Sequence, residues 1–206
     1  MIVLTRKERD KQLRRSDILT AAERIFAQKG FHEATIQDIA REAQYATGTV
    51  YLYFKDKDSL YFSLVEEKMK NLLSIIEEQS GKASDAEDKI RIMLNEELDF
   101  FEKNKDFFRI FLTERAKPRA VKDNKFSRSP VILQYKGFVL GLMKLGQEQK
   151  IIRSDYSPGR IAEIYMAVLM SVVFDWFREG DKDAVHLKDL AGFIIDIFFN
   201  GAGKKR

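Results

Sequence analysis

Apolar residues recur at helical spacing near the start of the chain. The first stripe falls at positions i, i+3, i+4, i+7 and i+8, which predicts one amphipathic helix: Ile18, Ala21, Ala22, Ile25 and Phe26. Ser16 and Asp17 precede the stripe as candidate N-terminal caps. Gly30 closes it, because glycine is common just after a helix end.

A second, short helix is predicted to follow. Thr35 and Asp38 have nearly the spacing and chemistry of a capping box, and the apolar stripe behind them runs from Ile36 to Ala43. The helix cannot run far beyond Ala43, because Thr47-Gly48-Thr49 disfavours its continuation.

A third helix is predicted over about Thr47 to Phe54. Val50 and Phe54 share one face of it at i, i+4 and can pack against a small core. The other faces carry large side chains, which is unusual for a purely structural helix: Tyr51, Leu52 and Tyr53.

Six further helices are predicted in the rest of the chain, with residues 117–130 as a loop. They cover about residues 57–78, 85–103, 106–116, 130–149, 158–178 and 186–200. Asp56 and the Ser157-Pro158 pair stand where helix starts are expected. The sequence gives no sign of a strand or an internal repeat. The chain is therefore predicted to be all-α, with about nine helices.

The amino-acid composition excludes several kinds of functional site. The 206 residues include only three prolines and no cysteine, which favours long helices and excludes disulfides, thiol catalysis and thiolate metal sites. The longest apolar stretch, Ile161 to Phe177, is interrupted by Glu163 and Asp175 and is shorter than a membrane span of roughly 20 residues. The chain does not begin with a signal-peptide core, so we expect a soluble, cytoplasmic protein that does not enter a membrane.

Positive charge is concentrated in the first quarter of the chain. The formal net charge is +4, of which residues 1–57 carry +3, and the densest part runs from Arg6 to Arg15. Such a segment is either an ordinary solvated tail or an arm that follows the DNA backbone or minor groove and adds salt-dependent affinity.

The second and third predicted helices, braced by the first, form a helix-turn-helix unit. The second helix of such a pair needs a short polar-aromatic outer face to enter a DNA major groove. Residues 14–60 resemble the DNA-binding head of the TetR family of bacterial repressors. Three motifs carry the resemblance: Ile18-Leu19-x-Ala21-Ala22-x-x-x-Phe26-x-x-x-Gly30-Phe31, Thr35-x-x-x-Ile39-Ala40-x-x-Ala43, and Thr47-Gly48-Thr49-Val50-Tyr51-Leu52-Tyr53-Phe54-Lys55-Asp56-Lys57-Asp58-Ser59-Leu60.

The resemblance implies that the third helix faces base edges or nearby backbone. Tyr53 and Lys57 should contact phosphates, and Thr35 and Gln37 should lie near the backbone. The alternative for the two tyrosines of this helix is a place in the core, and for Lys57 it is a solvated helix start. The candidate DNA-binding residues are Thr35, Gln37, Thr47, Gly48, Thr49, Tyr51, Leu52, Tyr53 and Lys57.

The turn of the motif departs from the family pattern, which usually reads Gly-Val-Ser. Gln44 replaces a glycine that accepts a positive φ, and Ala46 replaces a hydroxyl that caps the third helix, at a cost of about 1 kcal/mol. Tyr45 is therefore expected to pack differently from the usual valine.

The resemblance implies an inducer cavity between the middle helices of the second domain. The alternative is that the aromatic and methionine residues there are plain core. Mostly apolar lining favours a hydrophobic, aromatic or acyl-chain-like ligand. The candidate ligand-binding residues are Phe100, Phe101, Phe107, Phe108, Phe111, Phe138, Tyr165, Met166, Leu169 and Met170.

The last two helices, near residues 158–178 and 186–200, have apolar surfaces wider than one face needs. The resemblance implies that they form a four-helix dimer seam. A homodimer then presents two recognition helices to a palindromic operator in double-stranded DNA.

We therefore expect a helix-turn-helix DNA-binding domain over residues 1–57, with a basic N-terminal arm, and a ligand-sensing and dimerisation domain over residues 58–206. The expected function is a repressor released by a small apolar inducer. The alternatives are a ligand-independent architectural DNA binder, an apolar-ligand carrier and an enzyme. Enzyme activity, a cofactor and a metal site are not expected, because His32 and His186 are the only histidines and lie far apart in the sequence.

Overall fold

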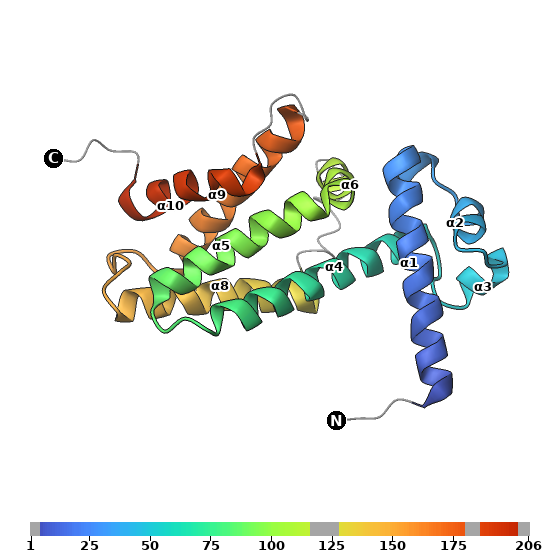
Figure 1. Ribbon diagram of the computed structural model, residues 1–206, viewed down its shortest axis with the longest axis horizontal. Coiled ribbons are helices and arrows are strands. Elements are labelled where there is room, and N and C mark those ends of the chain that lie inside the picture. Colours follow the sequence, from blue (N-terminus) through green and yellow to red (C-terminus); the bar gives the residue numbers. More distant parts are fainter. Residues whose placement is uncertain (1–4, 116–127, 180–185, 202–206) are drawn as a thin grey trace. The chain divides into compact units, whose positions relative to one another are not determined.

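The computed structural model describes residues 5–115, 128–179 and 186–201, and every regular element within these ranges is helical. This confirms the all-α prediction. The elements (Figure 1) are α1 (Arg6–Glu33), α2 (Ile36–Glu42), α3 (Thr47–Tyr51), α4 (Lys57–Ser80), α5 (Ala86–Lys103), α6 (Lys105–Arg115), α8 (Pro130–Glu148), α9 (Pro158–Glu179), the 3₁₀ helix η2 (Leu187–Leu190) and α10 (Ala191–Asn200).

The first helix begins well before the predicted start at Ser16. α1 starts at Arg6, where Thr5 and Glu8 form a complete capping box. The basic segment from Arg6 to Arg15 is therefore helical and not an extended tail. The expected role of Gly30 is confirmed, because its φ of 75° breaks the helical geometry of α1 near its C-terminal end.

Two other helices differ from their predicted bounds. The α-helical part of α3 ends at Tyr51, short of the predicted Phe54. The final helix, predicted over residues 186–200, is a 3₁₀ turn followed by α10. The predicted loop at 117–130 lies mostly outside the described residues.

The chain divides into two compact units, Met1–Lys68 with Asp106–Phe126, and Met69–Lys105 with Ser127–Arg206. The division falls inside α4, so the first unit also takes in the start of that helix and α6. The boundary predicted between residues 57 and 58 stands at the beginning of α4 and stays a prediction.

Each unit has its own apolar core. In the first unit the core lies where α1, α2 and α3 meet, and Ile18, Phe26, Ile39 and Val50 are completely buried there. In the second unit α5, α8, α9 and α10 surround a core of fully buried residues: Ile90, Met93, Val139, Met143, Val173 and Ile194.

None of the helices within the described ranges is long and apolar enough to cross a membrane. The same residues contain no group of three or more acidic, histidine or cysteine side chains placed to hold a metal ion.

Candidate nucleic-acid interface

The start of α2 is fixed by the capping box that the sequence predicts. The Thr35 hydroxyl accepts from the Asp38 amide at 3.1 Å, and the Asp38 carboxylate accepts from the Thr35 amide at 3.3 Å. Lys29 reaches the same carboxylate at 2.9 Å. The hydrogen bonds from Lys29 and Thr35 hold the pKa of Asp38 at about 2. α2 is thereby fastened to the end of α1, which sets where the turn after α2 begins.

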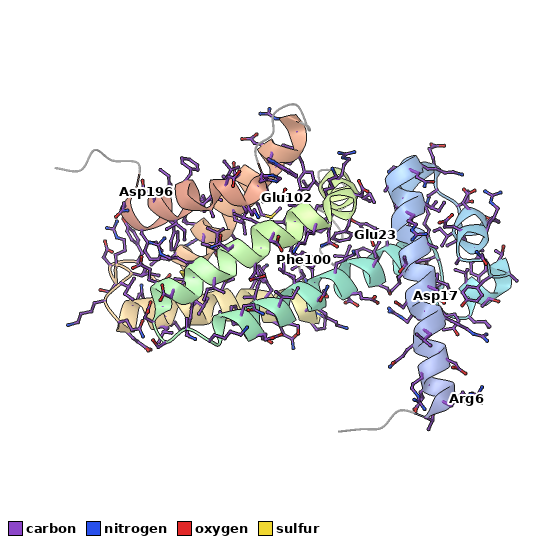
Figure 2. All side chains as sticks on the ribbon, in the orientation of Figure 1. Arg6, Asp17, Glu23, Phe100, Glu102 and Asp196 are labelled. Carbon is purple, nitrogen blue, oxygen red and sulfur yellow. The ribbon has the colours of Figure 1, made fainter. Side chains whose placement is uncertain are left out.

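The turn between α2 and α3 shows both departures from the family pattern. Gln44 has a φ of 60°, the region that glycine adopts without strain. Ala46 occupies the N-cap of α3 and supplies no side-chain hydrogen bond to it. Tyr45, between these two residues, is held by α1, because its hydroxyl donates to the carboxylate of Asp17 at 2.8 Å (Asp17 is labelled in Figure 2). That Tyr45 packs differently from the usual valine stays a prediction, and this hydrogen bond is one that valine could not make.

α3 turns one face into the core and the other toward solvent. Val50 and Phe54 are buried, which confirms their predicted inward face. Tyr51 and Leu52 point outward and are 52% and 80% exposed. A large apolar side chain that folding leaves in water has no packing role in the free protein. The outer face of α3 is therefore available to a partner.

Gly48 lies on the same exposed surface. A Cβ atom built at this position meets no atom within 4 Å, and its φ is not in the left-handed region. Neither steric crowding nor backbone conformation therefore requires glycine here. A missing side chain on an exposed helix instead permits close approach by a partner.

The remaining predicted DNA-binding residues also lie at the surface of the first unit. Thr35 and Gln37 are exposed at the start of α2, while Thr47, Thr49 and Tyr53 are half-buried on or after α3. The first unit therefore displays one set of hydroxyl, amide and aromatic groups from two neighbouring helices (Figure 1). Their contacts with DNA stay predictions.

Lys57 has a local structural role that the sequence reading missed. Its Nζ atom donates to the carbonyl oxygens of His32 and Ala34, each at 2.8 Å, and lies 4.7 Å from the centroid of the Phe31 ring. These contacts join the first turn of α4 to the end of α1. The predicted phosphate contact stays a prediction, and it would have to coexist with these bonds.

The second unit contains a cavity of about 670 Å³ beside the loop between α8 and α9. Its wall is largely apolar and includes Ile152, Ile161, Val168, Ile197 and Phe198. Two exposed arginines also line it: Arg153 pairs with Asp155, and Arg160 pairs with Glu163. A hollow with this lining suits an amphipathic ligand that carries an apolar part and an anionic group.

None of the ten predicted ligand-binding residues lines this cavity. Phe107, Phe108 and Phe111 belong to the first unit, where their rings pack against one another, one pair stacked and two edge-to-face. The others belong to the second unit, where Phe100, Phe101, Tyr165 and Leu169 are buried and Phe138, Met166 and Met170 are half-buried. The core alternative accounts for the buried members, and a ligand role for any of the ten stays a prediction.

A buried carboxyl group in the second unit was not anticipated. Glu97 on α5 is completely buried, and its two oxygens accept from the hydroxyls of Tyr135 on α8 and Tyr165 on α9, each at 2.5 Å. Burial raises the pKa of Glu97 to about 7, and the two tyrosine hydrogen bonds oppose that rise. The sequence did contain a signal, because Glu97 is four residues after Met93 and four before Phe101, inside the apolar stripe of α5.

A family model described as bacterial regulatory proteins, tetR family, matches residues 18–64. A fatty acid metabolism regulator protein from Bacillus subtilis (strain 168) is 21% identical over 188 residues, which are 91% of this chain and 95% of that protein. The HTH-type transcriptional regulator HbdR from Aromatoleum sp. (strain CIB) is 41% identical over 66 residues, which are 32% of this chain and 27% of that protein.

Solved structures share the fold over almost the whole chain. The fatty acid degradation regulator FadR from Bacillus halodurans has a TM-score of 0.85 at 24% identity and covers 93% of this chain and 97% of its own. The transcriptional regulator FadR from Bacillus subtilis, in complex with stearoyl-CoA, has a TM-score of 0.84 at 21% identity and covers 91% and 99%.

Proposed function

This chain belongs to the tetR family of bacterial regulatory proteins, and from that premise we propose that it represses transcription as a homodimer that an acyl-chain effector releases from DNA. The family makes it a DNA-binding transcription regulator. The observation that carries the proposal is the outer face of α3, where Tyr51 and Leu52 are exposed beside Gly48 on a braced helix.

The chemistry of that face suits the major groove. A tyrosine hydroxyl and the threonine hydroxyls can donate to or accept from base edges and phosphates, whereas Leu52 can only make an apolar contact, for which the thymine methyl group is the matching partner. The approach of DNA to Gly48 then lets the backbone of α3 come close to the groove floor. We infer an operator whose half-sites contain thymine opposite Leu52.

A dimer supplies the second recognition helix. On α9, Ile164, Ala167, Ser171 and Phe174 are all exposed and follow one another at intervals of three, four and three residues, which places them on one face. Phe193 on α10 is 58% exposed as well. Exposed small and apolar residues along one stripe of a helix are typical of a helix–helix interface. A two-fold dimer through α9 and α10 would present the two α3 helices about 34–36 Å apart.

The effector class is inferred from the relatives and from the lining of the cavity. One relative regulates fatty acid metabolism, and one structure with this fold was solved with stearoyl-CoA. For this chain we propose an acyl-coenzyme A thioester, whose chain suits the apolar wall and whose phosphates suit Arg153 and Arg160. Such a ligand weakens DNA binding only if it prefers the conformation that does not fit the operator.

The test is fluorescence anisotropy with duplexes from upstream of the chain's own gene and with scrambled duplexes of equal length. We expect tight binding to one native duplex, and release by acyl-CoA of long chain but not by free coenzyme A. If the protein binds native and scrambled duplexes equally, and a selection from random-sequence DNA also yields no preferred site, the proposed specific repressor is contradicted and an architectural DNA binder is favoured. Specific binding that no acyl-CoA weakens contradicts the effector class alone.

A further inference from the structure

The N-terminal part of α1 is helical but contributes no buried residue to the core of the first unit. The capping box at its start is complete, since Glu8 accepts from the Thr5 amide at 2.8 Å and the Thr5 hydroxyl accepts from the Glu8 amide at 3.3 Å. Ile18 is the first buried residue of α1. The twelve residues from Arg6 to Asp17 therefore extend the helix by roughly 18 Å beyond the core. Figure 1 shows this part of α1 running on past α3.

The direction of this extension relative to α3 is fixed within the first unit. Arg15 donates to the Glu67 carboxylate on α4 at 3.1 Å, and its guanidinium carbon lies 5.3 Å from the centroid of the Phe54 ring. Asp17 is held by Tyr45, as described above. The direction of the extension is therefore fixed by two contacts near its base, one from Arg15 to α4 and one from Asp17 to Tyr45.

Three cations form a stripe along the extension. Lys7, Lys11 and Arg14 are at positions i, i+4 and i+7, which places them within about 60° of one another around the helix. Ile18 continues the same line and is buried, so further along α1 the stripe gives way to the side that packs into the core of the first unit. All three side chains are exposed, and within the described residues no ion pair engages them.

The acidic residues nearby do not neutralise this face. Glu8 is on another side of the helix, where its carboxylate holds Thr5, and the hydrogen bonds from Thr5 lower its pKa. Asp17 accepts from Tyr45. Asp10 is the one acidic neighbour of the stripe, about 40° from Arg14 around the helix. The net charge of the stripe with Asp10 included remains positive.

We propose that Lys7, Lys11 and Arg14 form a second DNA contact, which holds the phosphodiester backbone beside the segment that α3 reads. This rests on the proposed function and adds to it a sequence-independent contact outside the helix-turn-helix unit. Lysine and arginine on a rigid helix match phosphates spaced along a duplex, and they carry no base information. A length of roughly 18 Å covers about five base pairs of flanking DNA.

The experiment compares the wild type with the triple variant Lys7→Gln, Lys11→Gln and Arg14→Gln. A matched control changes three exposed lysines of the second unit: Lys70→Gln, Lys136→Gln and Lys144→Gln. Both variants lose the same charge, and glutamine keeps the helix propensity of lysine and arginine. Circular dichroism checks that helix content is unchanged. Anisotropy is measured over a range of salt concentrations, on an operator duplex trimmed to the half-sites and on one extended by about ten base pairs at each end.

We expect the stripe variant to bind the extended duplex at least about 10-fold more weakly than the wild type at low salt. The slope of log affinity against log salt concentration should fall by up to about 5, the value for a dimer in which all three residues of both subunits contact phosphates. The control should match the wild type, and the difference should shrink on the trimmed duplex. An unchanged slope on the extended duplex overturns the proposal, and so does an equal loss on both duplexes. Absence of wild-type binding to any duplex contradicts the proposed function itself, so the two failures are distinguishable.

Discussion

The hydroxyl of Tyr165 donates a hydrogen bond of 2.5 Å to the completely buried carboxyl group of Glu97. The bond crosses from α9 to α5, and Tyr135 donates to the other oxygen of the same carboxyl group from α8. Three helices of the second unit therefore converge on one titratable group whose pKa is about 7.

Stability of the second unit should fall as the pH rises from about 4.5 to about 7. In this window the unfolded glutamate is ionised while the folded one keeps its proton, so raising the pH favours the unfolded state. Glu97→Gln should remove this dependence and stabilise the unit at pH 8 by on the order of 2 kcal/mol. The free energy of unfolding is measured by urea titration at each pH, with the fluorescence of Trp176, the single tryptophan, as the signal. The exposed Glu77→Gln is the control, and an unaltered pH profile in Glu97→Gln contradicts the prediction.

Replacing Lys57 separates its structural role from its predicted DNA role. Lys57→Ala removes two hydrogen bonds to the end of α1 and should lower the free energy of unfolding by about 1–2 kcal/mol. If Lys57 also contacts a phosphate, the salt slope of DNA binding falls by about one unit per subunit. A loss of stability with the slope unchanged would leave Lys57 as a structural clamp only.

Gly48→Ala should stabilise the protein and weaken its binding to DNA. Alanine is better in a helix than glycine by about 1 kcal/mol, and the added Cβ meets no atom of the free protein. Gly141→Ala, also helical with open space at its Cβ position, should stabilise equally and leave operator affinity unchanged. If Gly48→Ala binds the operator as tightly as the wild type, DNA does not approach α3 at this position.

Gln44→Gly should relieve the strained turn before α3. The φ of 60° is costly for glutamine but free for glycine, whose greater flexibility in the unfolded chain offsets part of the gain. The net stabilisation expected is about 0.5 kcal/mol. Gln44→Ala keeps the Cβ atom and should bring no gain. The midpoints of denaturant unfolding of the two variants are compared. Equal midpoints would contradict the interpretation that the backbone at position 44 is strained.

The proposed dimer seam is tested on its exposed apolar residues. Ile164→Glu and Phe174→Glu each place a charge on the stripe of α9 and should shift the protein from dimer to monomer at micromolar concentration. Leu133→Glu on α8 alters a residue of similar exposure outside the stripe and should leave the dimer intact. Light scattering gives the mass of each. A monomeric wild type would contradict the dimer itself.

Much of the fold followed from local signals in the sequence. The capping box at Thr35, the start of α4 after Asp56 and the glycine at position 30 each specify a helix end through one or two neighbouring residues, and the structure has all three. The start of α1 lies ten residues before the predicted cap at Ser16, although its signal is also local: Thr5 and Glu8 are three residues apart, as a capping box requires.

The chemistry of the second unit was less accessible to sequence reasoning. Tyr165 is one of the predicted ligand-binding residues, and its hydroxyl donates to a residue 68 positions earlier in the chain, which no local pattern indicates. Apolar periodicity tells which residues turn inward but not whether they meet one another or a cavity. The hydrogen bonds of Lys57 could not be predicted from the sequence either. Its two acceptors are backbone carbonyl oxygens, and every residue type has one.

The order of the elements has a practical consequence for dividing the molecule. The first unit consists of two separate stretches, because α6 follows α5 in the chain and yet belongs with α1 to α3. No single cut in the gene therefore yields either unit intact. A fragment that ends at Lys68 loses the aromatic cluster of Phe107, Phe108 and Phe111, and so leaves apolar surface of its own unit uncovered. Exchanging the first unit between relatives requires three crossovers, at the unit boundaries 68/69, 105/106 and 126/127.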